Sequence, residues 1–336
     1  MPAPIRWGIL STANIGRAAV CPAIRASSNG VLAAVASRDA SRAAFFAQAN
    51  EVPRHHGSYE ALLADDAIDA VYIPLPNSMH LEWTVRAAEA GKHVLCEKPL
   101  GLTAAECLEM DRAARANGVR LMEAFMYRFH PRTVRMVDLI RGGAIGRLAS
   151  IRSAFTFRLN RPDNIRLRAD LGGGALMDVG CYCVNVSRTL AGEEPVEAVA
   201  WARFGPTDVD EELTGMLRFP SGAVAHFDCA LTLERREICE AAGPGGSLAV
   251  EAAFVAGTGP TTITELRGRN PSQTHVGGTA DQYQVMVEHF GDCIVTGTEP
   301  RWPATEAAAN LAAIEALYRS ARAGGRPSQV AVPNDR

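Results

Sequence analysis

The sequence predicts an α/β protein, with an N-terminal Rossmann-type, doubly wound parallel sheet and a C-terminal α+β domain on a large, open, mostly antiparallel sheet. Over residues 5–125, short aliphatic strands alternate with amphipathic helical stretches, a rhythm typical of parallel sheets. From residue 148 onwards, longer alternating segments follow one another across close turns, which suits antiparallel hairpins. A chain of 336 residues also exceeds the size at which one core stops growing. We therefore expect two domains, 1–125 and 126–336.

The elements of the first half follow from short apolar runs and helical periodicity. Strands are predicted at Ile5–Leu10, Val31–Ala36, Ala70–Ile73, His93–Cys96 and Arg120–Ala124. Helices are predicted over 15–26, 40–49, 78–90 and 103–116, with Gly91 and Gly118 just past two of their ends.

The second half is predicted to begin with a helix over 130–141 and to continue as a sheet. Its strands are expected at 148–157, 196–204, 213–219, 223–233, 238–242, 247–251 and 261–266. The turns Pro220-Ser221-Gly222 and Gly243-Pro244-Gly245-Gly246 join neighbouring strands. Helices over 282–295 and 304–323 carry apolar residues at helical spacing, so we expect both to pack against this sheet.

Composition narrows the class of protein. A net charge of -3 without a basic stripe argues against nucleic-acid binding. No apolar run approaches the roughly 20 residues that cross a bilayer, and the N-terminus lacks the layout of a signal peptide. The eight cysteines form no CxxC pair and no zinc-type cluster, so we expect reduced core thiols and no metal. These features predict a cytoplasmic protein.

The turn after the first strand has the position and small residues of a dinucleotide-binding loop. Positions 11, 13 and 16 read Ser, Ala and Gly where such loops carry three glycines. We expect the loop to approach a pyrophosphate through Ser11, Thr12, Ala13, Asn14 and Ile15. The alternative is an ordinary turn into a helix, with Ser11 or Thr12 as its N-cap.

The end of the second strand indicates which nicotinamide nucleotide would bind. Arg38 and Arg42 lie one helical turn apart and can hold a phosphate, with the hydroxyl of Ser37 beside them. This pattern favours NADP over NAD. Asp39 keeps NAD open, because an acidic side chain here can reach the ribose hydroxyls. In the alternative interpretation, the arginines only solvate the start of a helix.

Two further segments carry candidate catalytic groups. Lys98 follows the strand His93–Cys96, at the carboxyl end where ligands bind in such sheets. A buried or half-buried ammonium loses hydration, so it needs either a polar partner or a functional role. In the second segment, Gly172-Gly173-Gly174 leads into a helix on which Asp178 and Tyr182 are four residues apart, so both should point from one face. The alternative is an Asp favoured by the helix dipole and a Tyr in the core.

Five motifs together resemble the glucose-fructose oxidoreductase and inositol dehydrogenase family, Gfo/Idh/MocA. They are the small-residue turn at 8–16, Ile73-Pro74-Leu75-Pro76-Asn77-Ser78-Met79-His80, Glu97-Lys98-Pro99, the run from Met122 to Pro131, and the segment from Asp178 to Tyr182. The resemblance implies a dinucleotide-binding first domain and a second domain whose sheet often forms a homodimer or homotetramer interface. It also implies that Lys98 lies beside nicotinamide and substrate.

Other positions in these motifs give candidate contacts. For the cofactor these are Leu75, Pro76, Asn77, His80 and Glu97, although His80 is equally suited to capping the next helix and Glu97 to a backbone contact. For the substrate they are Tyr127 and Arg128, at another strand's carboxyl edge, and Arg161, on a polar loop that also suits plain solvation.

Tyr182 is the informative departure within the family. Inositol dehydrogenase-like members carry histidine four residues after the motif aspartate, whereas this chain is similar to the NADP-dependent dihydrodiol dehydrogenases, xylose dehydrogenases and sugar 3-ketoreductases. We expect hydride transfer between nicotinamide and the carbinol or carbonyl carbon of a sugar, polyol or dihydrodiol.

The proton that accompanies the hydride needs a positioned acid or base. We assign this role to Tyr182, polarisation of the substrate oxygen to Lys98 and the holding of hydroxyls or of Lys98 to Asp178. Tyr182 and Lys98 can exchange roles on this reasoning. Two other functions stay open, an NAD-dependent glycosidase of the same fold and a non-catalytic NADP or sugar sensor.

Overall fold

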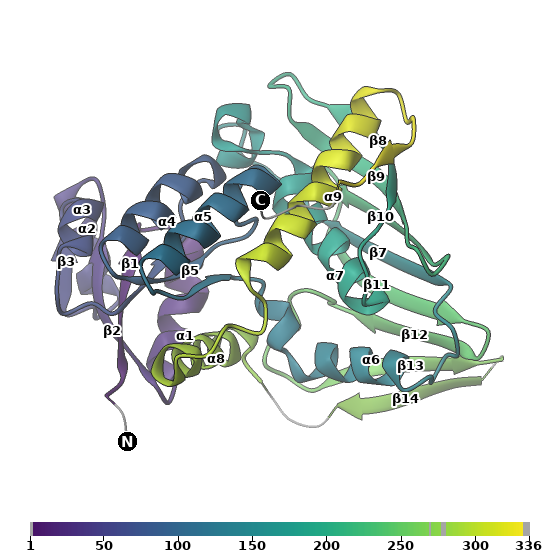
Figure 1. Cartoon of the computed structure of the whole chain (residues 1–336), viewed down its shortest axis with the longest axis horizontal. Helices are drawn as coiled ribbons and strands as arrows, with labels where there is room; N and C mark the ends of the chain where they lie inside the picture. The colour runs from purple at the N-terminus through teal and green to yellow at the C-terminus, as the bar shows by residue number, and fades with distance from the viewer. Residues whose placement is uncertain (1–2, 269, 277–279, 332–336) are drawn as a thin grey trace. The chain divides into compact units, whose positions relative to one another are not determined.

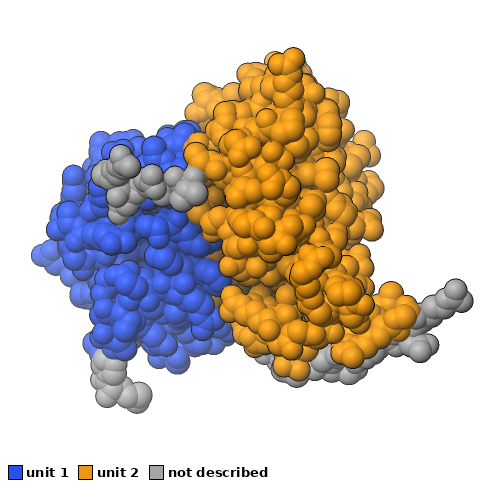
Figure 2. All heavy atoms as spheres, turned by 45° about the vertical axis from the view of Figure 1, so that its right-hand side comes forward, with its two compact units in different colours: residues 1–126, 281–308 blue, residues 127–280, 309–336 orange. Residues whose placement is uncertain are grey.

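The computed structural model describes residues 3–268, 270–276 and 280–331, and the side chains of 270–276 lie outside this description. The chain forms two compact units, residues 1–126 with 281–308 and residues 127–280 with 309–336 (Figure 2). The sequence-based division at 125/126 therefore differs from the observed grouping, because 281–308 return to the first unit.

The first unit contains a six-stranded parallel sheet in the order β3-β2-β1-β4-β5-β6 (Figure 1). Its strands are β1 (Ile5–Leu10), β2 (Gly30–Ala36), β3 (Arg54–His56), β4 (Ala70–Ile73), β5 (His93–Cys96) and β6 (Leu121–Glu123). Every residue of β4 is buried, and since neighbouring side chains point to opposite faces, both faces of the sheet are covered. The predicted doubly wound sheet is confirmed.

The helices of this unit are mostly those that periodicity predicts. They are α1 (Cys21–Ala26), preceded by a π-helical segment at Gly16–Val20, α2 (Ala40–Ala49), α3 (Tyr59–Leu63), α4 (His80–Glu89), α5 (Ala104–Ala116) and α8 (Gln282–Thr296). Asp39, Ser58 and Thr103 cap α2, α3 and α5 with side-chain oxygens. The sequence gives no signal for β3 and α3, which span three and five residues and are too short for a periodic pattern.

The prediction that both late helices pack on the second sheet is wrong for α8. The ring of Phe290 lies 5.8 Å from that of Trp7 on β1, and the side chain of Asn29 donates to the backbone oxygen of Glu288 at 2.8 Å. Gly291 permits this approach, because a Cβ there would lie 2.8 Å from the Asn29 side chain. An amphipathic pattern shows that a helix has a partner without showing which one.

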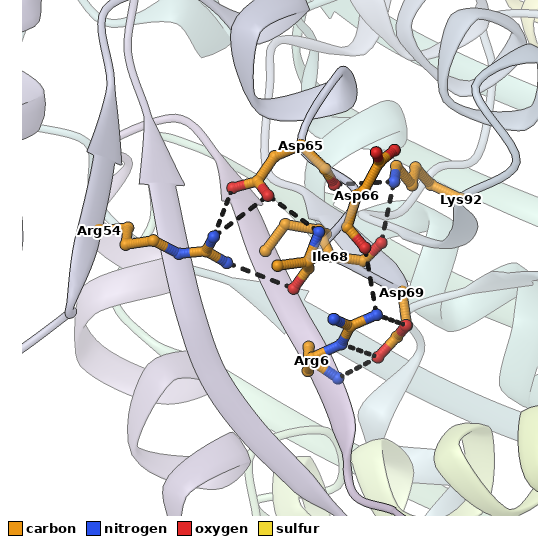
Figure 3. Close-up of polar contacts among 8 residues, drawn as sticks. Arg6, Arg54, Asp65, Asp66, Ile68, Asp69 and Lys92 are labelled. Carbon is orange, nitrogen blue, oxygen red and sulfur yellow. Dashed lines mark hydrogen bonds and ion pairs between the residues drawn. The ribbon is translucent and has the colours of Figure 1, made fainter.

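Charged residues gather at the amino ends of β1, β3, β4 and β5, and we call Arg6, Arg54, Asp65, Asp69 and Lys92 the amino-edge cluster (Figure 3). Arg6 donates from Nε and Nη2 to the two carboxylate oxygens of Asp69, at 2.8 and 2.6 Å. Arg54 pairs with Asp65 at 2.9 Å. The buried ammonium of Lys92 donates to the backbone oxygens of Asp65 and Ile68, each at 2.9 Å. These contacts fasten the chain after α3 to the sheet.

The second unit is built on a nine-stranded sheet in the order β14-β13-β12-β11-β7-β10-β9-β8-β15 (Figure 1). Its strands are β7 (Ser150–Thr156), β8 (Glu197–Phe204), β9 (Asp210–Arg218), β10 (Val224–Ala230), β11 (Arg236–Gly243), β12 (Gly246–Glu251), β13 (Thr261–Arg267), β14 (Asn270–Val276) and β15 (Ser328–Gln329). Only β10 and β7 run parallel among these pairs in the described residues. The mostly antiparallel prediction is confirmed.

Helices line one face of this sheet. They are α6 (Pro131–Arg141), α7 (Cys181–Ala191) and α9 (Ala304–Arg322), whose Ser320 hydroxyl accepts from the backbone of Ala200 on β8 at 2.9 Å. The prediction that the last helix packs on this sheet is confirmed. The other face exposes large apolar side chains, among them Trp201 and Met216, which are 55% and 42% accessible. Among the described residues, no helix is long and apolar enough to cross a membrane.

Candidate active site

The turn between β1 and the first helix places a serine where glycine is usual. Ser11 has φ of 146°, outside the region that L-residues prefer. Its hydroxyl donates to the Pro74 carbonyl at 3.2 Å and accepts from the Ala13 amide at 3.1 Å, so two hydrogen bonds hold the unusual backbone. A π-helical segment then starts at Gly16. Backbone strain and π-helical turns both concentrate at functional sites.

The remaining predicted loop residues differ in accessibility. Thr12, Ala13 and Ile15 are half-buried, and Asn14 is exposed. The amide oxygen of Asn14 accepts from Arg17 at 2.7 Å, which holds it at the outer side of the turn.

Two exposed arginines follow the end of β2, together with an aspartate that caps the next helix. Arg38 and Arg42 are exposed, whereas Ser37 is buried and accepts from the Asp39 amide at 3.3 Å. Asp39 Oδ1 accepts from the amides of Ser41 and Arg42, at 2.8 and 3.1 Å, and so caps α2. Burial raises the pKa of Tyr59, and the neighbouring Arg38 guanidinium opposes that rise. Two cations and one carboxylate are therefore exposed at this position, and the carboxylate already caps α2 through Oδ1.

Lys98 follows β5 on a loop that both neighbouring strands hold. Tyr72 on β4 donates its hydroxyl to Glu97 Oε1 at 2.5 Å. Glu123 on β6, which is 1% accessible, accepts from the Leu100 amide at 2.8 Å. Lys98 itself is half-buried. The contacts on either side of it fix the backbone from which the ammonium projects. Glu97 Oε2 also accepts from the Lys98 amide at 3.3 Å, and its predicted cofactor contact stays a prediction.

His80 holds the same loop from a third direction. Its ring is fully buried, with Nδ1 2.9 Å from the Pro99 carbonyl and Nε2 2.9 Å from that of Leu75. Burial lowers the pKa of His80 against the opposing effect of the two carbonyls, and a neutral ring donates to only one of them. Neither predicted role fits these contacts, because the ring has no accessible face for a cofactor and meets carbonyls instead of capping amides. It ties the loop after β4 to the loop after β5.

The other predicted residues after β4 lie on the first of those loops. Leu75 is buried, whereas Pro76 and Asn77 are half-buried, and Asn77 begins a short 3-10 helix that ends at Met79. Pro76 and Asn77 follow the carboxyl end of β4, and their predicted contact with the cofactor stays a prediction.

In the second unit, Asp178 lies on a π-helical segment, Leu176–Gly180, that continues into α7. Its Oδ2 accepts from Arg166 Nε at 2.5 Å. The amide of Gly174 donates to the Arg166 carbonyl at 2.8 Å, so the glycine run brings the loop with this arginine against the helix start. Sequence reasoning missed Arg166, since an arginine among several on a polar loop carries no distinguishing signal.

Tyr182 lies in the first turn of α7 among three aromatic rings. The ring centroids of Phe155, Phe254 and Tyr127 lie 5.4, 5.3 and 5.8 Å from its own. Aromatic contacts of this kind fix a ring's orientation. Tyr182 is 5% accessible, so most of its side chain is buried and the phenol ring has a fixed orientation.

The three predicted substrate residues have different surroundings. Tyr127 is 1% accessible and donates to Asn185 Oδ1 at 2.6 Å, so it lies in the interior and not at an open surface. Arg128 is also buried, at 2% accessible. A strand end predicts the edge on which a side chain lies, but not that the chain folds over it. Arg161 is exposed on the loop after β7, which leaves its prediction open.

Comparison with known proteins identifies the family. Residues 5–125 match the model of an oxidoreductase family with an NAD-binding Rossmann fold, and residues 133–249 match the GFO/IDH/MocA C-terminal domain. A D-xylose 1-dehydrogenase (NADP(+)) of Haloferax volcanii is 40% identical over 323 residues, which are 95% of this chain and 98% of the relative. The chain belongs to the Gfo/Idh/MocA oxidoreductase family. The resemblance inferred from the motifs is confirmed.

Solved structures of this family agree with the fold. An aldose-aldose oxidoreductase from Caulobacter crescentus, complexed with glycerol, has a TM-score of 0.90 and 30% identity, and the match covers 97% of this chain and 99% of that one. A 3-ketoreductase from Actinomadura kijaniata, in complex with NADP and TDP-benzene, has a TM-score of 0.89 and 30% identity, covering 94% and 98%. Both are oxidoreductases that share the two-part architecture.

Proposed function

We propose that this Gfo/Idh/MocA oxidoreductase uses NADP to oxidise or reduce a carbinol or carbonyl carbon of a sugar, a polyol or a dihydrodiol, with aldoses the first class to test. The observation that carries the proposal is Lys98 after β5, on a loop that the Tyr72–Glu97, His80–Pro99 and Glu123–Leu100 contacts hold. A 40% identical relative is a D-xylose dehydrogenase, and trans-1,2-dihydrobenzene-1,2-diol dehydrogenases are among the other relatives.

The choice of NADP rests on the end of β2. A cofactor without the 2'-phosphate is usually held by an acidic side chain here, and Asp39 already accepts two backbone amides. Arg38 and Arg42 are exposed cations suited to a phosphate. The small-residue turn at Ser11–Gly16 fits the pyrophosphate, since it leads from a parallel strand into a helix.

The proposed chemistry divides among three side chains. A bound nicotinamide supplies the acceptor or donor of the hydride. We assign polarisation of the reacting oxygen to Lys98, because its backbone is fixed and an ammonium stabilises developing negative charge. We assign transfer of the proton to Tyr182, whose ring is held by three aromatic neighbours. Asp178, oriented by Arg166, is assigned to substrate hydroxyls.

The assembly and location are proposals of the same kind. The exposed face of the nine-stranded sheet carries Trp201 and Met216, and Leu233 is exposed on the loop after β10; these side chains would be covered in a homodimer or homotetramer. Eight free cysteines, all of them buried, are consistent with a reducing compartment such as the cytoplasm. Size-exclusion chromatography with light scattering would measure the assembly, and a monomer at working concentration would contradict it.

The deciding experiment is a screen that monitors nicotinamide absorbance with aldoses, keto-sugars, inositols and dihydrodiols, each with NAD and with NADP. We expect NADP-dependent turnover in at least one class. Absence of turnover in all classes despite NADP binding would favour a sensor. Release of a sugar from a nitrophenyl glycoside, without net cofactor turnover, would instead identify a glycosidase.

A further inference from the structure

A buried aspartate lies at the start of the segment that carries Asp178 and Tyr182. Asp210, the first residue of β9, is 1% accessible. Its Oδ2 accepts from the Leu176 amide at 2.7 Å, and its Oδ1 accepts from the Tyr318 hydroxyl on α9 at 2.7 Å. The two hydrogen bonds join residues that are 34 and 108 positions apart in the chain. They connect the large sheet, the last helix and the segment that leads into α7.

The glycine run is shaped around this carboxylate. Gly174 has φ of 120°, and a Cβ there would lie 2.2 Å from Asp210 Oδ1 and 3.0 Å from the Tyr318 oxygen. The carbonyl of Gly174 accepts from the Asp178 amide at 3.0 Å, while its amide holds the carbonyl of Arg166, the partner of Asp178. Asp210 therefore contacts the backbone of Leu176, next to the point where both Asp178 and Arg166 are fixed.

We infer that Asp210 and Tyr318 are positioning residues, which hold the Leu176–Gly180 segment so that Asp178 and Tyr182 keep the orientation needed for turnover. The inference rests on the proposed function. A carboxylate that accepts an amide at the start of a helical segment is favoured by that segment's dipole, and it satisfies a backbone donor that would otherwise be buried without a partner. Neither residue touches the reacting atoms in this role.

Burial disfavours the ionised form of Asp210, so a positioning role can be told apart from a role in stabilising the fold. Burial raises the pKa of Asp210 to about 6. A raised folded-state pKa means that the stability gained from protonated Asp210 is lost as the pH rises through about 6. The ionised carboxylate at neutral pH is thus unfavourable for folding relative to its protonated form. The presence of an ionisable carboxylate at this buried position is therefore better explained by the orientation of Asp178 and Tyr182 than by the stability of the fold.

The groups around Asp210 predict the direction in which its pKa changes when Tyr318 loses its hydroxyl. The Tyr318 hydroxyl and Arg322 on α9 both favour the charged form of Asp210, while Cys229 on β10, whose pKa burial raises, and Cys181 on α7 lie near Tyr318. Removal of the Tyr318 hydroxyl takes away a donor to the carboxylate, so the pKa of Asp210 should rise further above its present value of about 6. Loss of activity on the acid side should then begin at a higher pH.

The experiment compares Asp210→Ala, Asp210→Asn and Tyr318→Phe in the full chain, with Asp228→Asn as a matched control. Asp228 lies on neighbouring β10 and pairs with Arg236. We expect kcat to fall about 100-fold in Asp210→Ala and about tenfold in Asp210→Asn, since small displacements of reacting groups have effects of this size. The acid limb of the kcat profile should move to higher pH in Tyr318→Phe and disappear in Asp210→Asn. The control should match the wild type.

A second readout keeps this inference apart from the proposed function. Hydrogen exchange of peptides that span 174–182 should accelerate in Asp210→Ala and stay unchanged in Asp228→Asn, whether or not a substrate is known. If the wild type shows no turnover, the proposed function fails while the exchange result still decides the positioning role. Wild-type kcat, pH profile and exchange in Asp210→Asn and Tyr318→Phe would overturn the inference, even if Asp210→Ala fails to fold.

Discussion

The two edges of the six-stranded sheet use their polar residues in opposite ways. At the amino edge, Arg6 pairs with Asp69, Arg54 pairs with Asp65, and Lys92 donates to two carbonyls (Figure 3). At the carboxyl edge, hydrogen bonds to backbone amides hold the Ser11 turn and the Leu100 loop, and Arg38 and Arg42 are exposed. At the amino edge the charged side chains bind one another and the backbone. At the carboxyl edge, hydrogen bonds fix loops whose charged side chains are exposed.

This difference shows why charge alone does not identify a functional lysine. Lys92 and Lys98 both lie near the ends of β5, and a buried ammonium needs partners in either place. The ammonium of Lys92 satisfies carbonyls after α3, whereas the loop of Lys98 is fixed by the hydrogen bonds of its neighbours. The comparison predicts that one lysine governs stability and the other governs turnover.

The largest effect is expected from Lys98→Met. Loss of the ammonium should reduce kcat by about 10²- to 10⁴-fold, because a positioned charge and proton donor contribute on that scale. The Tyr72–Glu97 and Glu123–Leu100 contacts remain in the variant, so the loop should keep its backbone conformation and the loss should appear in kcat. Steady-state kinetics and calorimetry check this. Full activity would remove Lys98 from the mechanism.

Lys92→Met is the matched variant at the other edge. It removes the donor from the Asp65 and Ile68 carbonyls, so we expect a loss of about 1–3 kcal/mol in the free energy of unfolding. Activity per folded molecule should match the wild type. Urea denaturation and kinetics on the same preparation measure both quantities, and a stable variant with low turnover would reverse the assignment of the two edges.

Arg38→Ala tests the charge presented at the carboxyl edge. Loss of a phosphate contact should raise the KM for NADP about tenfold and leave the KM for NAD nearly unchanged. Arg86→Ala serves as a control, because Arg86 is an arginine on α4 that pairs with Glu60 and Glu82. Equal losses with both nucleotides would show that Arg38 does not distinguish them.

Asp69→Asn is expected to have the smallest effect. Its hydrogen bond with Arg6 lowers the pKa of Asp69 in the folded state, so the stabilisation is present above the unfolded pKa and is lost as pH falls through the folded value. At neutral pH the variant should lose about 1 kcal/mol, because the pair is partly exposed. At about pH 3 the difference should shrink. A constant difference across this range would exclude the ionised pair as its source.

The sequence predicted the elements that rest on local patterns. The parallel strands β1, β4 and β5 have the predicted limits, because each is a short apolar run ended by turn residues. Lys98 and the small-residue turn were found in the same way, as unusual residues at strand ends. What failed was the choice of partner, as for α8, which packs on β1 and α1 instead of the second sheet.

Side-chain roles that depend on distant contacts were also missed. Nothing near His80 indicates that its ring joins two loops, and nothing near Tyr127 indicates that Asn185 and Phe254 cover it. Asp210 and Tyr318 give no signal either, since their meeting with Leu176 and Gly174 arises only when the sheet and the last helix are folded. A single sequence shows which residue types are present, but not which of them converge.

The most direct test of the proposed function is to follow a deuterium label from the reacting carbon of the substrate. The wild-type chain is mixed with NADP and the substrate that the screen identifies, deuterated at that carbon, and the nicotinamide product is analysed by mass spectrometry. Hydride transfer predicts labelled NADPH at wild-type rates, and a rate lower by about 10²- to 10⁴-fold in Lys98→Met. Unlabelled NADPH, or labelled NADPH formed equally fast by Lys98→Met, would contradict the proposed chemistry.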